Sequence, residues 1–225
     1  MDSSVRTAWI GLVRLIFILA LLLFVPAWSL DFWQAWMYIA LFLGWTVFVT
    51  AYLIKYDRSL LEKRLSAGPQ AEKEKAQKII QSLASFFTIF LIVLPGFDHR
   101  LHWSEVCLPL ILGAELVFVG GYVLAFLALR ENSFASSTIE IQAEQRIIES
   151  GPYTVIRHPM YTGAILMSMA TPLALGSWWS LPAAIPIVIV ICARLMQEEK
   201  LLLRDLPEYK EYCKRTRFRL IPFVW

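Results

Sequence analysis

Polar side chains that could bind a ligand are concentrated between residues 151 and 163, where the sequence reads GPYTVIRHPMYTG. An apolar run begins at Met160, and Pro159 suits the first turn of a helix because its fixed φ fits there and its missing N–H would have no partner. Arg157 and His158 would then lie at the amino end of that helix, where free N–H groups favour an anionic ligand group. Each side chain alone is typical of an interfacial anchor, but the combination favours a binding site.

A second charged cluster lies at the end of a later apolar run and contains Arg194, Glu198 and Glu199. Arg194 and Glu198 are four residues apart, so on a helix they would share a face and could form an ion pair. Charges at the edge of a bilayer are costly and usually face a protein interior or a cavity. The alternative is a local salt bridge that only marks where the helix leaves the membrane, and the sequence favours neither interpretation for these residues alone.

The rest of the chain is too apolar for an ordinary soluble domain. Of its 225 residues, 58% are hydrophobic and 17% are charged, against roughly 45–50% and about 25% in average soluble domains. The 9 Trp and 14 Phe residues exclude a disordered chain. A net charge of +3, with no basic groove, predicts no nucleic-acid partner. We therefore expect an all-α polytopic membrane protein.

Six apolar runs predict about six transmembrane helices, since about 20 residues cross a bilayer. They cover approximately residues 9–28, 32–54, 79–97, 106–129, 160–175 and 178–196. Only Gly176 and Ser177 separate the last two, which predicts a tight helical hairpin. We expect a single integral-membrane domain over residues 1–225, in which 1–105 hold the first three spans and 106–225 form the core.

The basic residues predict how the chain lies in the membrane. All of the 21 Lys and Arg residues except Arg14, Arg100 and Arg194 fall at the amino end, between spans two and three, between spans four and five, or after span six. By the positive-inside rule these segments, and both termini, should be cytoplasmic.

The polar segments on that side differ in what they indicate. The long loop 130–159 is typical of a functional loop, whereas 57–78 is more typical of a solvated connector. The tail 207–222 could lie on the membrane as an amphipathic surface anchor. Glu115, within the fourth span, either lines a cavity or pairs with a polar neighbour.

Several common kinds of site are not indicated. The three cysteines are isolated, and His99 and His102 have no third ligand nearby, so no metal site is predicted. The chain has no GxGxxG, GxxxxGK[ST], GxSxG or HExxH motif, which excludes a soluble-type Rossmann site.

Three motifs together resemble the family of isoprenylcysteine carboxyl methyltransferases, which also includes phospholipid methyltransferases. They are RHPMYTG at 157–163, RLMQEE at 194–199, and PEYKEY followed by RFRLIP in the tail. The resemblance covers roughly residues 130–225. It implies an integral-membrane enzyme that uses S-adenosylmethionine without a Rossmann fold, with its site on the cytoplasmic side.

The resemblance also implies roles for individual residues. It assigns Arg194 to the acceptor side and Glu198 to the cofactor, and we expect these two to be the catalytic residues. Gln145 stands where the carboxyl methyltransferases have a histidine. The positions expected to bind the cofactor are Gln145, Ile147, Ile148, Tyr153, His158, Pro159, Tyr161, Glu198 and Glu199.

Methyl transfer from a sulfonium is an in-line displacement, so such a site mainly supplies alignment and a dry cavity. We expect a lipophilic acceptor that enters from the bilayer, in the first place an isoprenylcysteine carboxylate or a similar prenyl or lipid carboxylate. Phospholipid or small-thiol methylation, an NADPH-dependent sterol-type reductase, and a non-catalytic transporter or assembly protein are the alternatives. We expect a bacterial inner membrane, or the endoplasmic reticulum in a eukaryote.

Overall fold

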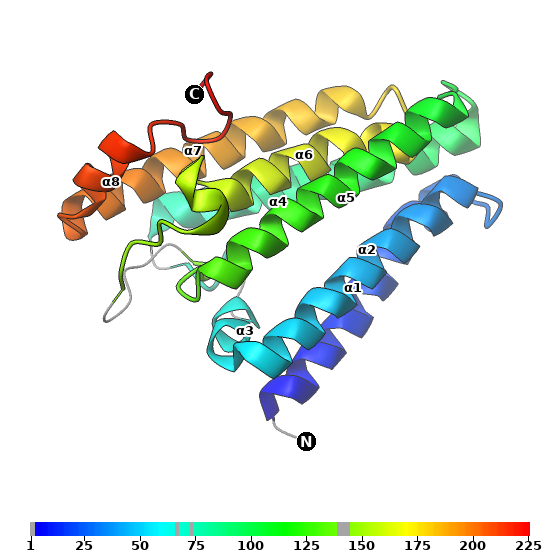
Figure 1. Cartoon of the computed structure of the whole chain (residues 1–225). Helices are drawn as coiled ribbons and strands as arrows, with labels where there is room; N and C mark the ends of the chain where they lie inside the picture. Colours follow the sequence, from blue (N-terminus) through cyan, green and yellow to red (C-terminus); the bar gives the residue numbers. More distant parts are fainter. Residues whose placement is uncertain (1–2, 66–67, 73, 139–144) are drawn as a thin grey trace.

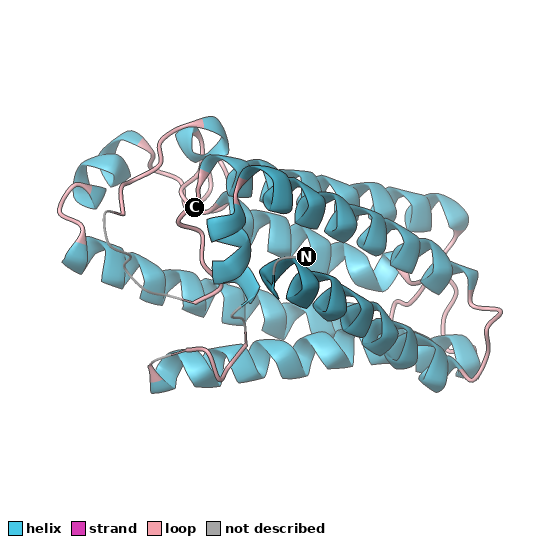
Figure 2. Cartoon of the chain, turned by 90° about the horizontal axis from the view of Figure 1, so that it is seen from below, coloured by secondary structure: helices cyan, strands magenta, loops and turns pink. Residues whose placement is uncertain are grey.

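The computed structural model describes residues 3–65, 68–72, 74–138 and 145–225. Within these residues the chain forms helices joined by loops, and Figure 2 shows no β-strand among them. The predicted all-α fold class is therefore confirmed. The long helices are α1 (Ser3–Ala27), α2 (Trp33–Tyr56), α4 (Lys75–Leu101), α5 (Leu108–Glu131), α6 (Pro159–Ala174) and α7 (Leu181–Asp205). The short ones are α3 (Arg58–Leu65), the 3-10 helix η1 (Gly151–Thr154) and α8 (Tyr209–Arg215).

The long helices run antiparallel, so the connections gather at two ends of the bundle (Figure 1). One end holds the turns between α1 and α2, between α4 and α5, and between α6 and α7. The opposite end holds the amino terminus, α3, η1 and α8. The long polar segments of the sequence therefore meet at one end of the molecule.

Five helices, α1, α2, α4, α5 and α7, have the length and apolar composition of membrane spans. The remaining predicted run, 160–175, forms α6, which begins at Pro159 as expected. Its 16 residues extend about 24 Å at 1.5 Å per residue, less than the hydrocarbon thickness of about 30 Å. Beyond its carboxyl end, Gly176 takes a φ of +74° in the turn that leads to α7. All six predicted runs are thus helical, and five of them are long enough to span a membrane.

Helices α5 and α6 pack closely because two glycines face each other. A Cβ built on Gly121 would lie 2.7 Å from the carbonyl oxygen of Gly163, and one built on Gly163 would lie 2.5 Å from the carbonyl oxygen of Gly121. Real Cβ atoms do not approach a backbone oxygen so closely, so any larger residue would push the helices apart. Small residues at such contacts let membrane helices pack backbone to backbone. This contact sets the position of the first turns of α6.

The main apolar core lies between α1, α2, α4, α5 and α6 and includes Phe32, Tyr38 and Phe118. The Tyr38 hydroxyl lies 3.0 Å from Oγ1 of Thr171 and links α2 to α6. Glu115 is also buried in α5, and neither of its carboxylate oxygens has a hydrogen-bond partner among the described residues.

Candidate active site

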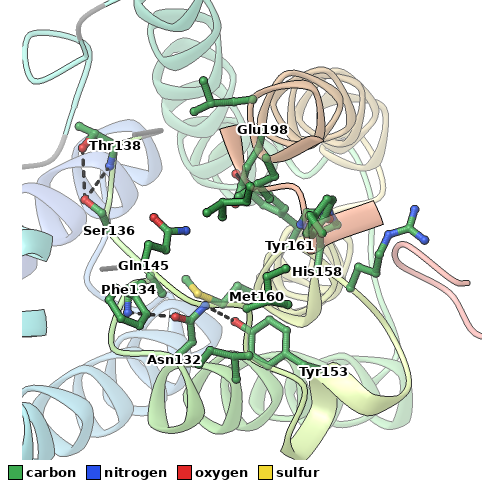
Figure 3. Close-up of a pocket in the computed structure, with 18 of the residues that line it drawn as sticks. Asn132, Phe134, Ser136, Thr138, Gln145, Tyr153, His158, Met160, Tyr161 and Glu198 are labelled. Atoms are coloured by element: carbon green, nitrogen blue, oxygen red, sulfur yellow. Dashed lines mark hydrogen bonds between the residues drawn. The ribbon is translucent and has the colours of Figure 1, made fainter. Parts of the chain in front are cut away.

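A cavity of about 340 Å³ lies at the end of the bundle that holds η1 and α8. This volume is within the range of small-molecule sites. Figure 3 shows that side chains of η1, α6, α7 and the segment after α5 surround it. We call it the site cavity; its lining includes Arg64, Asn132, Phe134, Ser136, Thr138, Gln145, Arg146, Ile147, Ile148, Tyr153, Arg157, His158, Met160, Tyr161, Arg194, Glu198, Tyr209 and Tyr212.

Most of the predicted site residues line this one cavity, although they come from four separate segments. The residues that do so are Gln145, Ile147, Ile148, Tyr153, His158, Tyr161, Arg194 and Glu198. Pro159 and Glu199 do not line it. Pro159 acts as the first residue of α6, where it follows the capping residue His158.

The segment that leads into α6 is held in place by the carboxyl-terminal tail. The backbone N–H groups of Arg157 and His158 donate to the carbonyl oxygens of Phe218 and Arg219, at 2.9 and 3.0 Å. The Thr162 hydroxyl donates to the carbonyl oxygen of Leu220 at 2.9 Å. The expected surface anchor is therefore at least in part a structural element of the site, because it fixes the start of α6.

Glu199 holds this arrangement together from α7. Its carboxylate accepts hydrogen bonds from Nε of Arg157 at 2.8 Å and from Nε of Arg219 at 2.7 Å, and it lies 3.2 Å from Nε2 of His158. Burial opposes the charged form of Arg157, but the bonded Glu199 carboxylate raises the pKa of the guanidinium above its usual value. Glu199 is itself buried. It therefore contacts the residues that line the site cavity and not the cavity itself.

Glu198, the neighbouring residue, faces the site cavity (Figure 3). It is half-buried, and its Oε2 accepts a hydrogen bond of 2.6 Å from the Tyr161 hydroxyl. Among the described residues that line the cavity, it is the only carboxylate. Its charge has no cationic partner in the part of the chain that the structure describes.

Arg194 does not form the ion pair with Glu198 that the helical spacing allowed. Its Nη1 lies 2.8 Å from Oε1 of Glu72, which is buried in the segment before α4. Its Nη2 donates to the carbonyl oxygen of Ser137 at 2.8 Å. Sequence spacing shows only the partners on the same helix, whereas this partner comes from another part of the chain.

Tyrosines form much of the remaining wall. The Tyr153 hydroxyl accepts a hydrogen bond of 3.2 Å from Nδ2 of Asn132, and burial raises the pKa of Tyr153 to about 12. Burial also raises the pKa of Tyr209 above its usual value. Both phenols are therefore neutral near pH 7. Together with Tyr161 they give the cavity an aromatic lining with hydroxyl groups.

Sequence reasoning missed two parts of the lining. Arg64 comes from α3, in the segment interpreted as a connector, and Tyr209 and Tyr212 come from α8, in the segment interpreted as an anchor. The PEYKEY motif at 207–212, which is part of the family resemblance, could have indicated that α8 contributes to the site. No local pattern indicated Arg64, because only the fold brings α3 next to the residues that follow α5.

Comparison with known proteins gives two findings. A family model described as phospholipid methyltransferase matches residues 108–207. The Delta(14)-sterol reductase TM7SF2 of Mus musculus is 25% identical over an alignment of 138 residues, and the match covers 55% of this chain and 33% of that protein. The match thus spans about a third of the length of that reductase.

The family match begins with α5 and ends two residues after α7, so it includes most of the segments that build the site cavity. Residues 108–207 thus match the phospholipid methyltransferase family, which is also part of the family that the sequence motifs resemble.

Proposed function

We propose that this protein transfers a methyl group from S-adenosylmethionine to a lipophilic acceptor in the site cavity. One observation supports this most: Glu198 presents a half-buried carboxylate, without a cationic partner among the described residues, to a cavity lined by tyrosines. A carboxylate and aromatic faces both attract cations, and such attraction is stronger where water is partly excluded. The methyl donor carries a sulfonium and an ammonium group.

The residues present fit this cofactor. Glu198 could pair with the ammonium group of the cofactor, and the aromatic rings of Tyr153, Tyr161 and Tyr209 could contact its sulfonium group. Ile147 and Ile148 supply apolar surface for a purine, while Gln145 and His158 add polar groups; all of them line the cavity. S-adenosylmethionine, when bound, supplies an electrophilic methyl group.

The protein's own residues would then align the two reactants and keep water away. Transfer to a carboxylate needs no general base, because this nucleophile is already an anion at neutral pH. An ammonium headgroup would first have to lose a proton. His158 is held by Glu199, and Glu198 is bonded by Tyr161. This supports a prenyl or lipid carboxylate as the acceptor, with a phospholipid amine or a small thiol as the alternative.

The acceptor would reach the cavity from the bilayer, with its hydrocarbon part remaining in lipid. The basic segments lie at the same end of the bundle as the site cavity. By the positive-inside rule this end would face the cytoplasm, in a bacterial inner membrane or the endoplasmic reticulum.

Calorimetric titration of the purified protein with S-adenosylhomocysteine, the demethylated cofactor, tests the proposal. We expect Glu198→Gln to weaken binding at least about tenfold, since a hydrogen bond to a charged group contributes roughly 1.5–3 kcal/mol. Glu208→Gln, at an exposed position, is the matched control and should bind like the wild type. Equal affinity of the wild type and Glu198→Gln would contradict the proposal.

A sterol-type reductase is the second candidate, because the similarity to the Mus musculus Delta(14)-sterol reductase supports it. Such an enzyme would bind NADPH, whose phosphates carry several negative charges. Glu198, without a cationic partner in the described residues, would repel a phosphate placed beside it, whereas it would attract the ammonium group of S-adenosylmethionine. Titration of the tryptophan fluorescence separates the two candidates: a saturable response to NADPH, with none to S-adenosylmethionine, would favour the reductase.

A further inference from the structure

Among the described residues, those that line the site cavity carry more positive charge than the one carboxylate, Glu198, can neutralise. Four arginines line it. Arg157 is paired with Glu199, and Arg194 is paired with Glu72. Arg146 is exposed to solvent. Arg64 is half-buried, and its charge has no carboxylate partner among the residues that the structure describes.

Within the described part of the chain, Arg64 uses little of its hydrogen-bonding capacity. One nitrogen, Nη1, donates to the carbonyl oxygen of Ala135 at 3.1 Å. A guanidinium has five N–H donors in a planar fork, which matches a carboxylate or a phosphate. Burial lowers the pKa of Arg64 below its usual value, because desolvation disfavours the charged form. The side chain is therefore available to an anionic ligand.

The position of Arg64 is well defined by its surroundings. Leu60 and Leu61 anchor α3 in a buried cluster with Ala8 and Leu53 of α1 and α2. The Ser137 hydroxyl donates to the carbonyl oxygen of Arg64 at 3.2 Å. The guanidinium thus lies on a short helix that is fixed both to the first two helices and to the segment after α5.

We propose that Arg64 binds the anionic group of the lipophilic acceptor, a carboxylate or a phosphate; this inference rests on the proposed function. Two observations assign this group to the acceptor. Arg64 lies outside residues 108–207, which match the family and hold every position expected to bind the cofactor. It also lies on the side of the cavity that is next to α1 and α2, two helices with the composition of membrane spans.

This assignment differs from the one that the resemblance implied for Arg194. The charge of Arg194 is already neutralised by Glu72, at 2.8 Å, and a second nitrogen is bonded to Ser137. An anionic acceptor would have to displace Glu72 in order to bind Arg194. Arg64 requires no such exchange.

Ligand binding to the protein saturated with S-adenosylhomocysteine, in an uncharged detergent, tests the inference. The probes are a prenyl thioether with a free carboxylate, S-farnesyl-N-acetylcysteine, its neutral carboxamide, and dodecyl phosphate. We expect the wild type to prefer at least one anionic probe over the carboxamide by about tenfold or more, and Arg64→Gln to lose that preference. Preference for the prenyl carboxylate would indicate a carboxylate acceptor, and preference for dodecyl phosphate would indicate a phosphate headgroup.

Two further variants separate recognition from structure. Lys63→Gln is the matched control, because Nζ of Lys63 also bonds the segment after α5, at Ser133, but the side chain does not line the cavity. It should behave like the wild type. Arg64→Lys keeps the charge and should retain part of the preference.

Three results would overturn the inference. They are a wild type without preference for either anion, an Arg64→Gln variant that keeps the preference, and an Arg64→Gln variant whose affinity for S-adenosylhomocysteine falls as much as its affinity for the anionic probe. The last result would assign Arg64 to the cofactor's carboxylate. Failure of the wild type to bind S-adenosylhomocysteine at all would instead contradict the proposed function.

Discussion

Two adjacent carboxylates at the end of α7 have different surroundings. Glu199 is buried and bonded by Arg157 and Arg219, whereas Glu198 faces the site cavity and is bonded by Tyr161. Successive residues on a helix point about 100° apart, so one side chain can face the bundle while the next faces a cavity. The resemblance assigned both to the cofactor because both belong to the RLMQEE motif, and the motif does not show which of the two side chains faces the cavity.

At the same scale, the role of Glu199 makes a prediction about the tail. Arg219→Gln should lower the free energy of unfolding by about 1–3 kcal/mol, because it removes a charge-assisted hydrogen bond from a buried carboxylate. Arg217→Gln is the matched control: this side chain is exposed, and exposed substitutions usually change stability by less than about 0.5 kcal/mol. Thermal unfolding in detergent measures both. Equal stability of the two variants would show that the Arg219 bond contributes nothing.

At the scale of elements, the sequence predicted those parts that are encoded locally. Continuous apolar runs located all six long helices, and Pro159 correctly marked the start of α6. The contribution of α3 and the pairing of the tail with residues 157–158 were not predictable in this way. Both depend on contacts between segments far apart in the chain, such as the bond of Arg157 to Phe218, which leave no local spacing pattern.

The contact between α5 and α6 can be tested with two neighbouring glycines. Gly121→Ala places a Cβ 2.7 Å from a backbone oxygen of α6, whereas a Cβ at Gly120 meets nothing within 4 Å. We expect Gly121→Ala to lower the free energy of unfolding by about 1–3 kcal/mol through overpacking. Gly120→Ala should leave stability unchanged or raise it slightly, since alanine favours the helix.

Thermal unfolding and the affinity for S-adenosylhomocysteine together measure the effect. Because His158 and Tyr161 lie at the start of α6, Gly121→Ala should also weaken binding of this ligand. If both alanine variants unfolded at the same temperature, the close contact would not constrain α6.

At the scale of the whole molecule, the fold gathers its polar chemistry at one end of an apolar bundle. The family-matched segment supplies the positions expected to bind the methyl donor, and α3 adds an arginine from the amino-terminal part of the chain. A site built in this way is open to a water-soluble cofactor while it adjoins helices that could admit a lipid. Such a division would let related proteins change the acceptor without changing the cofactor site.

The most direct test of the account is methyl transfer itself. Membranes that contain the protein are incubated with S-adenosylmethionine labelled at the methyl group, and the label extracted into organic solvent is measured. The account predicts label above the level of membranes without the protein, reduced at least about tenfold by Glu198→Gln and unchanged by Glu208→Gln. No extractable label above that background, or equal label with wild type and Glu198→Gln, would contradict it.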